Sequence, residues 1–253
     1  MQTIAVIDFE TTGSSPAQGA RATEIAAVLV EDGRIVARFQ SLMHTGAWVP
    51  PFIEQLTGIT NAMLRTAPPA RAVMHEVARF TRGVPLVAHN AAFDRGFWQA
   101  ELAEADCEPD PAHAFACTVR LSRRLYPHAE NHRLGTLARL HALPSAGRAH
   151  RALADAEVTA HLLMRVQRDV QHQFAAELAS TGVSHALLVA MQAAAKGQLR
   201  RSVERHLSRC AAAAAAGAAS PGAHVSIALP VSPVSPDSPD SPAAMEAAAD
   251  VAG

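Results

Sequence analysis

The chain has 253 residues, 49% of them hydrophobic, and its 22 Lys and Arg nearly balance its 23 Asp and Glu. This length and composition predict one globular domain of moderate size with additional segments. No apolar run approaches the roughly 20 residues that cross a membrane, and the first ten residues lack the basic region of a signal peptide.

The cysteines and the charge distribution narrow the class of protein further. Cys107, Cys117 and Cys210 are odd in number and lack metal-ligand spacing, so we expect a reduced, cytoplasmic protein. Residues 210–253 contain four acids and no Lys or Arg, which leaves 22 basic and 19 acidic side chains in residues 1–209. This slightly basic body permits a nucleic-acid partner without predicting one.

The first third of the chain predicts a strand, a hairpin and short helices. In chain order, these are a buried strand over 3–9, a hairpin over 23–43, two short helices within 50–69 and a helix over 69–81. Asp32 and Gly33 supply the hairpin turn, Thr60 is the expected cap of the second short helix, and Val73 and Val77 share one face of the helix that follows.

Short strands then alternate with helices. In chain order, we expect a strand over 85–89, a helix over 91–105 capped by Asn90, a strand over 114–117, helices near 118–125 and 133–141, and a long helix from just after His150 to about residue 178. A hairpin followed by alternating strands and helices predicts an α/β fold with a mixed sheet of about five strands, flanked by helices.

Two further segments follow the expected domain of residues 1–178. Residues 179–209 predict a basic amphipathic helical extension, helical over 183–207, which packs on the body or docks on a partner or on phosphates. Residues 210–253 are rich in Ala, Pro and Ser, cannot bury a core and are expected to be disordered.

Two acids interrupt the first apolar run, "AVIDFETTG". Because alternate residues of a strand share a face, Asp8 and Glu10 point the same way, roughly 6.6–7 Å apart. Two anions near a core are costly unless a cation or hydrogen bonds neutralise them. A solvated strand end is the ordinary alternative. However, the turn residues "TTG" follow at once, at the strand end where α/β sheets bind ligands.

Two other segments add acids at the ends of predicted buried elements. In "LVAHNAAFDRGFW", Asp94 falls in the first turn of a helix, where an acid that complements the helix dipole is the alternative. In "HRALADA", His150 precedes a helix and Asp155 lies on its second turn, and a surface histidine is the alternative.

Four carboxylates that converge require divalent cations, and an all-oxygen ligand set favours Mg²⁺ or Mn²⁺ over zinc. Two such ions about 3.5–4 Å apart can bind the attacking and leaving oxygens of a phosphodiester. His150 would then supply a base that works near neutral pH.

The segments "IDFETTG", "VAHNAAFD" and "HRALADA" resemble, in order, the three motifs of the DnaQ-like 3′→5′ exonucleases of the DEDDh type. The resemblance covers about residues 3–170 and includes "LTGIT" at 56–60. The sister class has a Tyr four residues before the last Asp, whereas this chain has Arg151 there and only one tyrosine, Tyr126. The His type is therefore favoured.

This resemblance implies an RNase H-like fold and a two-metal site. Asp8, Glu10, Asp94 and Asp155 match the family's acids for two Mg²⁺ or Mn²⁺ ions, and His150 matches its general base. Asp8 would bridge both ions, with Glu10 and Asp155 completing one and Asp94 helping to hold the other.

The resemblance also implies which side chains surround the terminal nucleotide. They are Thr11, Thr12, Leu56, Thr57, Ile59, Asn90 and Phe93. Apolar side chains can stack on a base without reading its identity, although Leu56, Ile59 and Phe93 are equally typical of a core.

We therefore expect an exonuclease that releases nucleoside 5′-monophosphates from single-stranded or frayed 3′ ends of DNA. Two alternatives stay open. The chain is a proofreading or accessory subunit that meets a DNA polymerase through residues 183–209, or it trims the 3′ ends of RNA.

Overall fold

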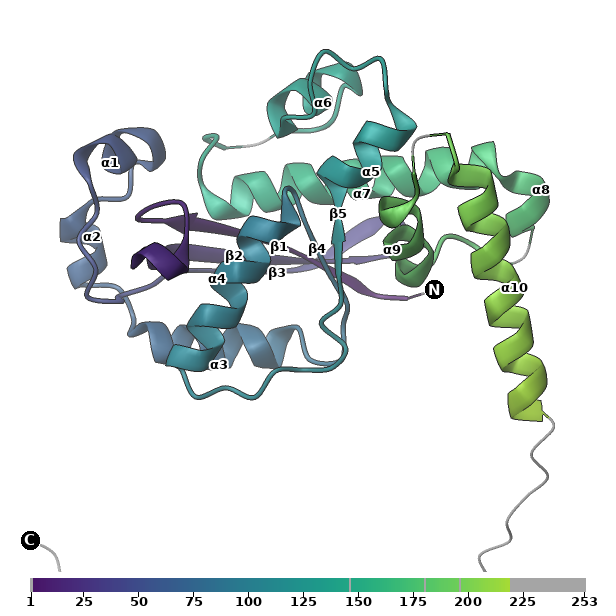
Figure 1. Ribbon diagram of the computed structural model, residues 1–253. Helices are drawn as coiled ribbons and strands as arrows, with labels where there is room; N and C mark the ends of the chain where they lie inside the picture. The colour runs from purple at the N-terminus through teal and green to yellow at the C-terminus, as the bar shows by residue number, and fades with distance from the viewer. Residues whose placement is uncertain (1, 146, 180, 196, 219–253) are drawn as a thin grey trace, which may run out of the picture. The chain divides into compact units, whose positions relative to one another are not determined.

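A mixed sheet lies at the centre of the computed structural model, which describes residues 2–145, 147–179, 181–195 and 197–218 (Figure 1). Within these residues the sheet has five strands in the order β3-β2-β1-β4-β5. They are β1 (Ile4–Thr11), β2 (Ala22–Glu31), β3 (Arg34–Leu42), β4 (Leu86–Ala88) and β5 (Phe115–Cys117). The β1-β2 and β2-β3 pairs are antiparallel, and the β1-β4 and β4-β5 pairs are parallel. The expected five-stranded α/β fold is confirmed.

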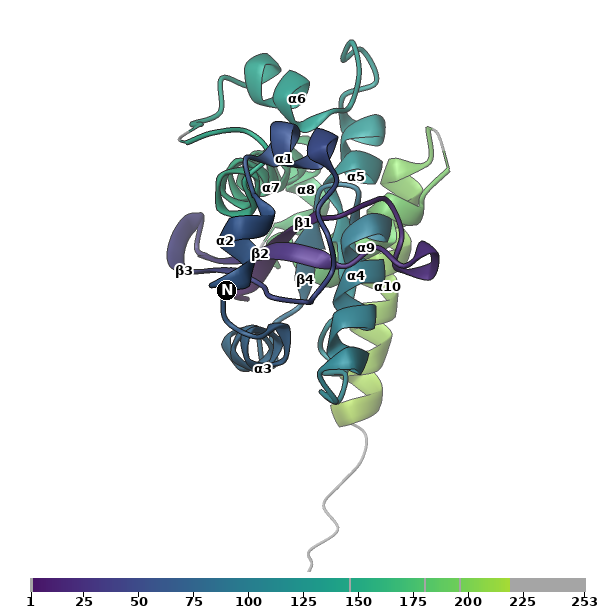
Figure 2. The same ribbon diagram turned by 90° about the vertical axis from the view of Figure 1, so that its left-hand side faces the viewer.

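Helices surround this sheet. They are α1 (Pro51–Thr57), α2 (Asn61–Arg65), α3 (Ala70–Phe80), α4 (Ala91–Glu104), α5 (Thr118–Leu125), α6 (Leu134–Leu140), α7 (Ala152–Gln173), α8 (Ala175–Leu178), α9 (His185–Ala193) and α10 (Leu199–Ala218), with a 3₁₀ turn at Pro16–Gln18. Figures 1 and 2 show α7 on one face of the sheet and α3 on the other. Residues through Ala213 form one compact unit, and the second unit, Ala214–Gly253, is described only to residue 218.

Strand β1 is buried on both faces, which explains its nearly unbroken apolar sequence. Ile4 and Val6 belong to the core cluster that contains α7, whereas Ala5, Ile7 and Phe9 belong to the cluster that contains α3 and α4. Because side chains alternate along a strand, the even-numbered acids of β1 share the face that α7 covers. The alternation therefore directs both acids toward the α7 side of the sheet.

Two helix boundaries differ from the sequence prediction. The helix after His150 ends at Gln173 rather than near 178, because Phe174 leaves the helical conformation and buries its ring in the core. Asn90 precedes α4 but its side chain makes no capping bond; it has a φ of 68°, in the left-handed region that Asn tolerates better than most residues. Thr60 does cap α2, since its side chain accepts a hydrogen bond from the Met63 amide at 3.2 Å.

The stretch expected to be helical over 183–207 is two helices, α9 and α10. Leu187, Leu188, Met191 and Val203 are buried in the core cluster that α7 lines. The expectation of disorder from residue 210 is wrong for 210–218, which extend α10 because this alanine-rich sequence has a high helix propensity.

The rest of the expected tail, 219–253, lies outside the described residues. None of the helices in the described parts of the chain is long and apolar enough to cross a membrane.

Candidate active site

Asp8 and Glu10 lie where β1 leaves the sheet. Glu10 pairs in register with Glu24 of β2, and the register shifts immediately afterwards, between Glu10 and Thr11. Glu10 is only 9% exposed and Asp8 is half-buried. Both carboxyls are therefore held near the core at the strand end, as the sequence predicted.

Asp94 reaches the same strand from the first turn of α4. Its side chain is only 2% exposed, and Oδ1 accepts a hydrogen bond from the Phe9 amide at 3.3 Å. The parallel pairing of β4 with β1 brings the start of α4 to this edge of the sheet. As a result, Asp94 is anchored to the peptide between the two strand acids.

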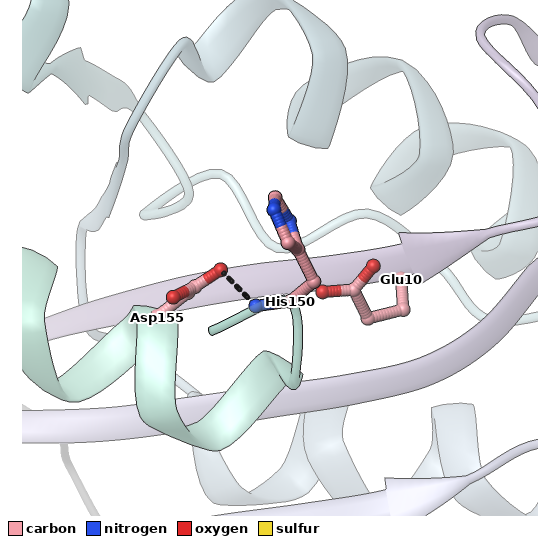
Figure 3. A group of neighbouring side chains, drawn as sticks. All are labelled: Glu10, His150 and Asp155. Atoms are coloured by element: carbon pink, nitrogen blue, oxygen red, sulfur yellow. Dashed lines mark hydrogen bonds between the residues drawn. The ribbon is translucent and has the colours of Figure 1, made fainter. Parts of the chain in front are cut away.

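His150 and Asp155 approach from the start of α7. The His150 amide donates to Asp155 Oδ2 at 3.1 Å, and ligand atoms of Glu10, His150 and Asp155 all lie within 4.8 Å of one another. Figure 3 shows the His150 backbone between the two carboxylates, with its imidazole extending away from the Glu10–Asp155 line. His150 is exposed and has a φ of 61°, which is uncommon for a residue other than glycine.

The four acids share a strongly unfavourable electrostatic environment. Burial, followed by the charges of Asp94 and Glu10, raises the pKa of Asp8 well above its ordinary value. Burial and then the Asp155 charge raise the pKa of Glu10 to about 8. Burial also raises the pKa of Asp94 to about 7, although the bond from the Phe9 amide opposes this, and raises the pKa of Asp155 against the bond from His150.

A fifth acid near the cleft, Glu24, forms a salt bridge with Arg151. Glu24 is fully buried and accepts hydrogen bonds from Arg151 at 2.7 and 3.0 Å, from the Ala152 amide at 3.0 Å and from Gln40 at 2.6 Å. Burial alone would raise the pKa of Glu24, but these bonds lower it below its ordinary value. Because Arg151 follows His150 directly, Glu24 fixes the backbone at the start of α7. Glu24 was not among the residues predicted from the sequence, although an acid inside the buried strand of the hairpin is a usable signal.

The predicted site residues line a cleft of about 860 Å³. We call it the acidic cleft, and it contains Asp8, Glu10, Asp94, His150 and Asp155. The other expected residues that line it are Thr11, Thr12, Leu56, Thr57, Asn90 and Phe93.

Ile59 is the exception among the predicted site residues. It is fully buried in a small core with Val49, Ile53 and Leu64, because the turn after α1 directs it inward. Its assignment to the nucleotide site is therefore not supported by the cleft geometry.

Helix α1 forms the opposite wall of the acidic cleft. Phe52 is 66% exposed and Leu56, one turn later, is 46% exposed, and both line the cleft. Arg148 donates to the backbone oxygens of Gln55 and Leu56 at 3.1 and 3.4 Å, which ties the segment before His150 to the end of α1. Phe52 was not among the residues predicted from the sequence, although its i, i+4 spacing to Leu56 in "PFIEQLTG" places the two side chains on one face of the helix.

The sequence matches a known family over most of this domain. The family model RNase_T, described as "Exonuclease", matches residues 5–163. The chain belongs to the DnaQ-like exonuclease family. This confirms the resemblance inferred from the three motifs and the RNase H-like fold that it implied.

Relatives of this exonuclease domain include two much longer proteins. The chain is 41% identical over 170 residues to the 3′-5′ exonuclease DinG of Bacillus subtilis and 38% identical over 164 residues to the PolC-type DNA polymerase III of Halalkalibacterium halodurans. Each alignment covers 65% of this chain but only 18% of the first protein and 11% of the second. The chain thus spans less than a fifth of the length of either relative.

Solved structures share the fold. Exonuclease X in complex with 5′ overhanging duplex DNA is 30% identical with a TM-score of 0.52, and the match covers 65% of this chain and 91% of that one. E. coli Exonuclease I in complex with a dT13 oligonucleotide has a TM-score of 0.59 over 70% of this chain and 44% of that one. At 19% identity, this second likeness shows the fold alone.

Proposed function

We propose that this chain is a metal-dependent 3′→5′ exonuclease that hydrolyses phosphodiester bonds at single-stranded or frayed 3′ ends of DNA and releases nucleoside 5′-monophosphates. The observation that supports this best is the acidic cleft itself. Four carboxyls from β1, α4 and α7 meet there beside His150. Burial raises the pKa of each, and the charges of neighbouring acids add to this at Asp8 and Glu10.

The acids fit divalent cations. They offer only oxygen donors, which suits Mg²⁺ or Mn²⁺. Arg151, whose charge acts on Glu10, is already bonded to Glu24. We assign Asp8, Glu10, Asp94 and Asp155 as the residues that would hold two ions. When bound, the ions would polarise the phosphodiester and lower the pKa of a water molecule.

The chain's own residues would move the proton and hold the strand end. His150 would accept the proton of the attacking water, because imidazole can act as a base near neutral pH. Its exposed position at the mouth of the cleft leaves the ring free to do so, while the Glu24–Arg151 pair holds its backbone. Leu56, Phe93 and the missed Phe52 would contact the terminal base, and the backbone after Glu10 would meet the 3′-hydroxyl.

A second candidate function is proofreading beside a DNA polymerase. The similarity to PolC-type polymerases favours it. The apolar residues of α9 are already buried in the core, so a polymerase would meet the exposed basic residues of α10.

Three free cysteines suit a reducing compartment such as the cytoplasm.

One assay tests the proposal directly. The purified chain is incubated with 5′-labelled DNA and RNA oligonucleotides of equal sequence in Mg²⁺, in Mn²⁺ or in EDTA. We expect a ladder that shortens from the 3′ end, faster on DNA, and no cleavage in EDTA. Asp8→Asn should be inactive, while Glu76→Gln, which alters an exposed acid on α3, should be fully active.

Internal fragments, shortening from the 5′ end or activity in EDTA would each refute the proposed function. Preferential degradation of the RNA would replace DNA with RNA as the substrate.

A further inference from the structure

A second concave surface adjoins the acidic cleft. It encloses about 1000 Å³ and shares His89, Asn90, His150 and Asp155 with the cleft. Its remaining walls come from α5, from α6 and the segments on either side of it, and from the first turns of α7. Figure 1 shows α5 and α6 together above α7. The two hollows are therefore continuous across the residues that carry the proposed chemistry.

The charge of this surface is opposite to that of the cleft. Arg123, Arg133 and Arg139 line it, and its one acidic lining residue among those described is Asp155, at the boundary with the cleft. We call the surface lined by these three arginines the basic groove.

The three arginines are exposed, and none has an ion-pair partner among the described residues. Arg139 makes one weak bond, to the Thr136 hydroxyl at 3.4 Å.

Several arginines elsewhere in the chain already hold acids. Arg21 and Arg151 hold buried carboxylates, and Arg71 and Arg165 pair with acids at the surface. The cations of the basic groove are therefore left available for an external anion. Their field also acts locally, since burial and then Arg123 lower the pKa of His132 in the same wall.

The neighbouring chemistry indicates which anion this is. A nucleic-acid strand carries one negative charge per nucleotide, and an acidic cleft repels every phosphate that is not at the metal ions. A strand whose 3′ end lies in the cleft therefore needs compensating cations along the rest of its backbone. The planar guanidinium of an arginine can donate two parallel hydrogen bonds to phosphate oxygens, so it matches a phosphate in geometry as well as in charge.

We propose that the basic groove binds the phosphodiester backbone of the substrate beyond its terminal nucleotide, through Arg123, Arg133 and Arg139. This proposal rests on the proposed exonuclease function. The backbone belongs either to the strand under degradation or to its complement in a duplex, and the two sources are separable by experiment.

The test compares a small substrate with long ones. The p-nitrophenyl ester of thymidine 5′-monophosphate reaches only the acidic cleft, whereas a 20-nucleotide single strand and a duplex with a recessed 3′ end also reach the groove. The Arg123→Glu, Arg133→Glu, Arg139→Glu triple variant is compared with the triple Lys variant, which retains the charges. Arg34→Glu, at the exposed β2–β3 turn, is the control for a charge reversal outside the groove.

We expect the triple Glu variant to hydrolyse the ester normally but to lose about 10–100-fold in kcat/KM on long substrates near physiological salt. The slope of log kcat/KM against log salt should become shallower by about 2, since each single-strand phosphate contact contributes about 0.7. The triple Lys variant should retain most of the activity and slope. Loss on the single strand assigns the groove to the degraded strand, and loss on the duplex alone assigns it to the complement.

Two results would overturn the proposal. One is an unchanged rate and salt slope on both long substrates in the triple Glu variant. The other is an equal loss on the ester and on the oligonucleotides, which would indicate damage to the cleft rather than a lost phosphate site. If the wild-type chain hydrolyses no substrate at all, the proposed function itself fails, and this outcome is distinct from both.

Discussion

Without divalent cations, the acidic cleft should make the stability of the protein fall as the pH rises through neutrality. In the folded chain the pKa of Glu10 is about 8 and that of Asp94 about 7, whereas the same groups ionise near pH 4 in an unfolded chain. Between these values the folded state binds more protons than the unfolded state. Its free energy of unfolding therefore decreases with increasing pH, and the contribution of these two groups to the decrease ends above about pH 8.

In the window between pH 6.5 and 8, this decrease in the free energy of unfolding is least opposed by the titration of histidines. Below pH 6.5, buried histidines have the opposite effect. Burial lowers the pKa of His89 to about 4, so the contribution of His89 to the free energy of unfolding rises with pH until histidine in the unfolded chain loses its proton near pH 6.5. Within the window, linkage gives a loss of about 2 kcal/mol from Glu10 and about 1 kcal/mol from Asp94. For a domain of this size, that corresponds to a decrease in melting temperature of roughly 5–10 °C.

The assay is a melting curve at pH 6.5 and pH 8, in EDTA and in millimolar Mg²⁺ or Mn²⁺. Metal binds ionised carboxylates, so the gain in melting temperature with metal should be larger at pH 8 than at pH 6.5. Glu10→Gln removes one titrating group and should reduce both the pH dependence in EDTA and the gain with metal. The Glu76→Gln control should preserve both. A melting temperature in EDTA that is constant or rises across the window would refute the reasoning, as would an undiminished metal gain in Glu10→Gln.

Three further predictions concern single groups. His150→Ala should lower kcat by about 10²–10⁴-fold while the metal-induced rise in melting temperature persists, and wild-type turnover would exclude His150 as the base. Glu24→Gln should lower the free energy of unfolding by about 2–4 kcal/mol in chemical denaturation, because the Arg151 charge loses its buried partner. The kcat of this variant should also fall. An unchanged kcat would show that the Glu24–Arg151 pair does not position His150. In a time course with 5′ labels, a 3′-phosphorylated oligonucleotide should be degraded far more slowly than the same oligonucleotide with a 3′-hydroxyl. The phosphate adds about 1.5–2 negative charges, which would lie against the carboxylates of the cleft. Equal rates would contradict recognition of the 3′ end at Glu10.

Much of the site was accessible from the sequence because motifs and strand ends coincide. Asp8, Glu10 and Asp94 each lie beside an apolar run short enough to be a buried strand, and parallel or neighbouring strands bring such ends together. The family resemblance then implied the direction of attack and the role that we propose for His150. These inferences needed only local pattern and the order of the elements.

Tertiary contacts decided the rest. In "LTGIT", the sequence contains two apolar residues next to a turn, and only the packing of the small core distinguishes buried Ile59 from exposed Leu56. The end of α7 depends likewise on Phe174, which leaves the helix to fill the core. No pattern within one segment predicts the Glu24–Arg151 pair, whose members are 127 residues apart in the chain.

Glu10 and Glu24 are neighbouring buried acids whose pKa values shift in opposite directions. The two residues face each other in register on β1 and β2, and both are buried. Glu24 receives a guanidinium, a helix amide and a side-chain amide, so its pKa is lowered. Glu10 receives no comparable set of donors among the described residues, and its pKa rises to about 8. The fold thus neutralises the acid that anchors α7 with its own arginine, and it leaves the neighbouring acids in the state that the proposed metal site requires. Three arginines without an ion-pair partner among the described residues line the adjoining basic groove, where we expect them to attract phosphates without competing for the proposed metal ligands.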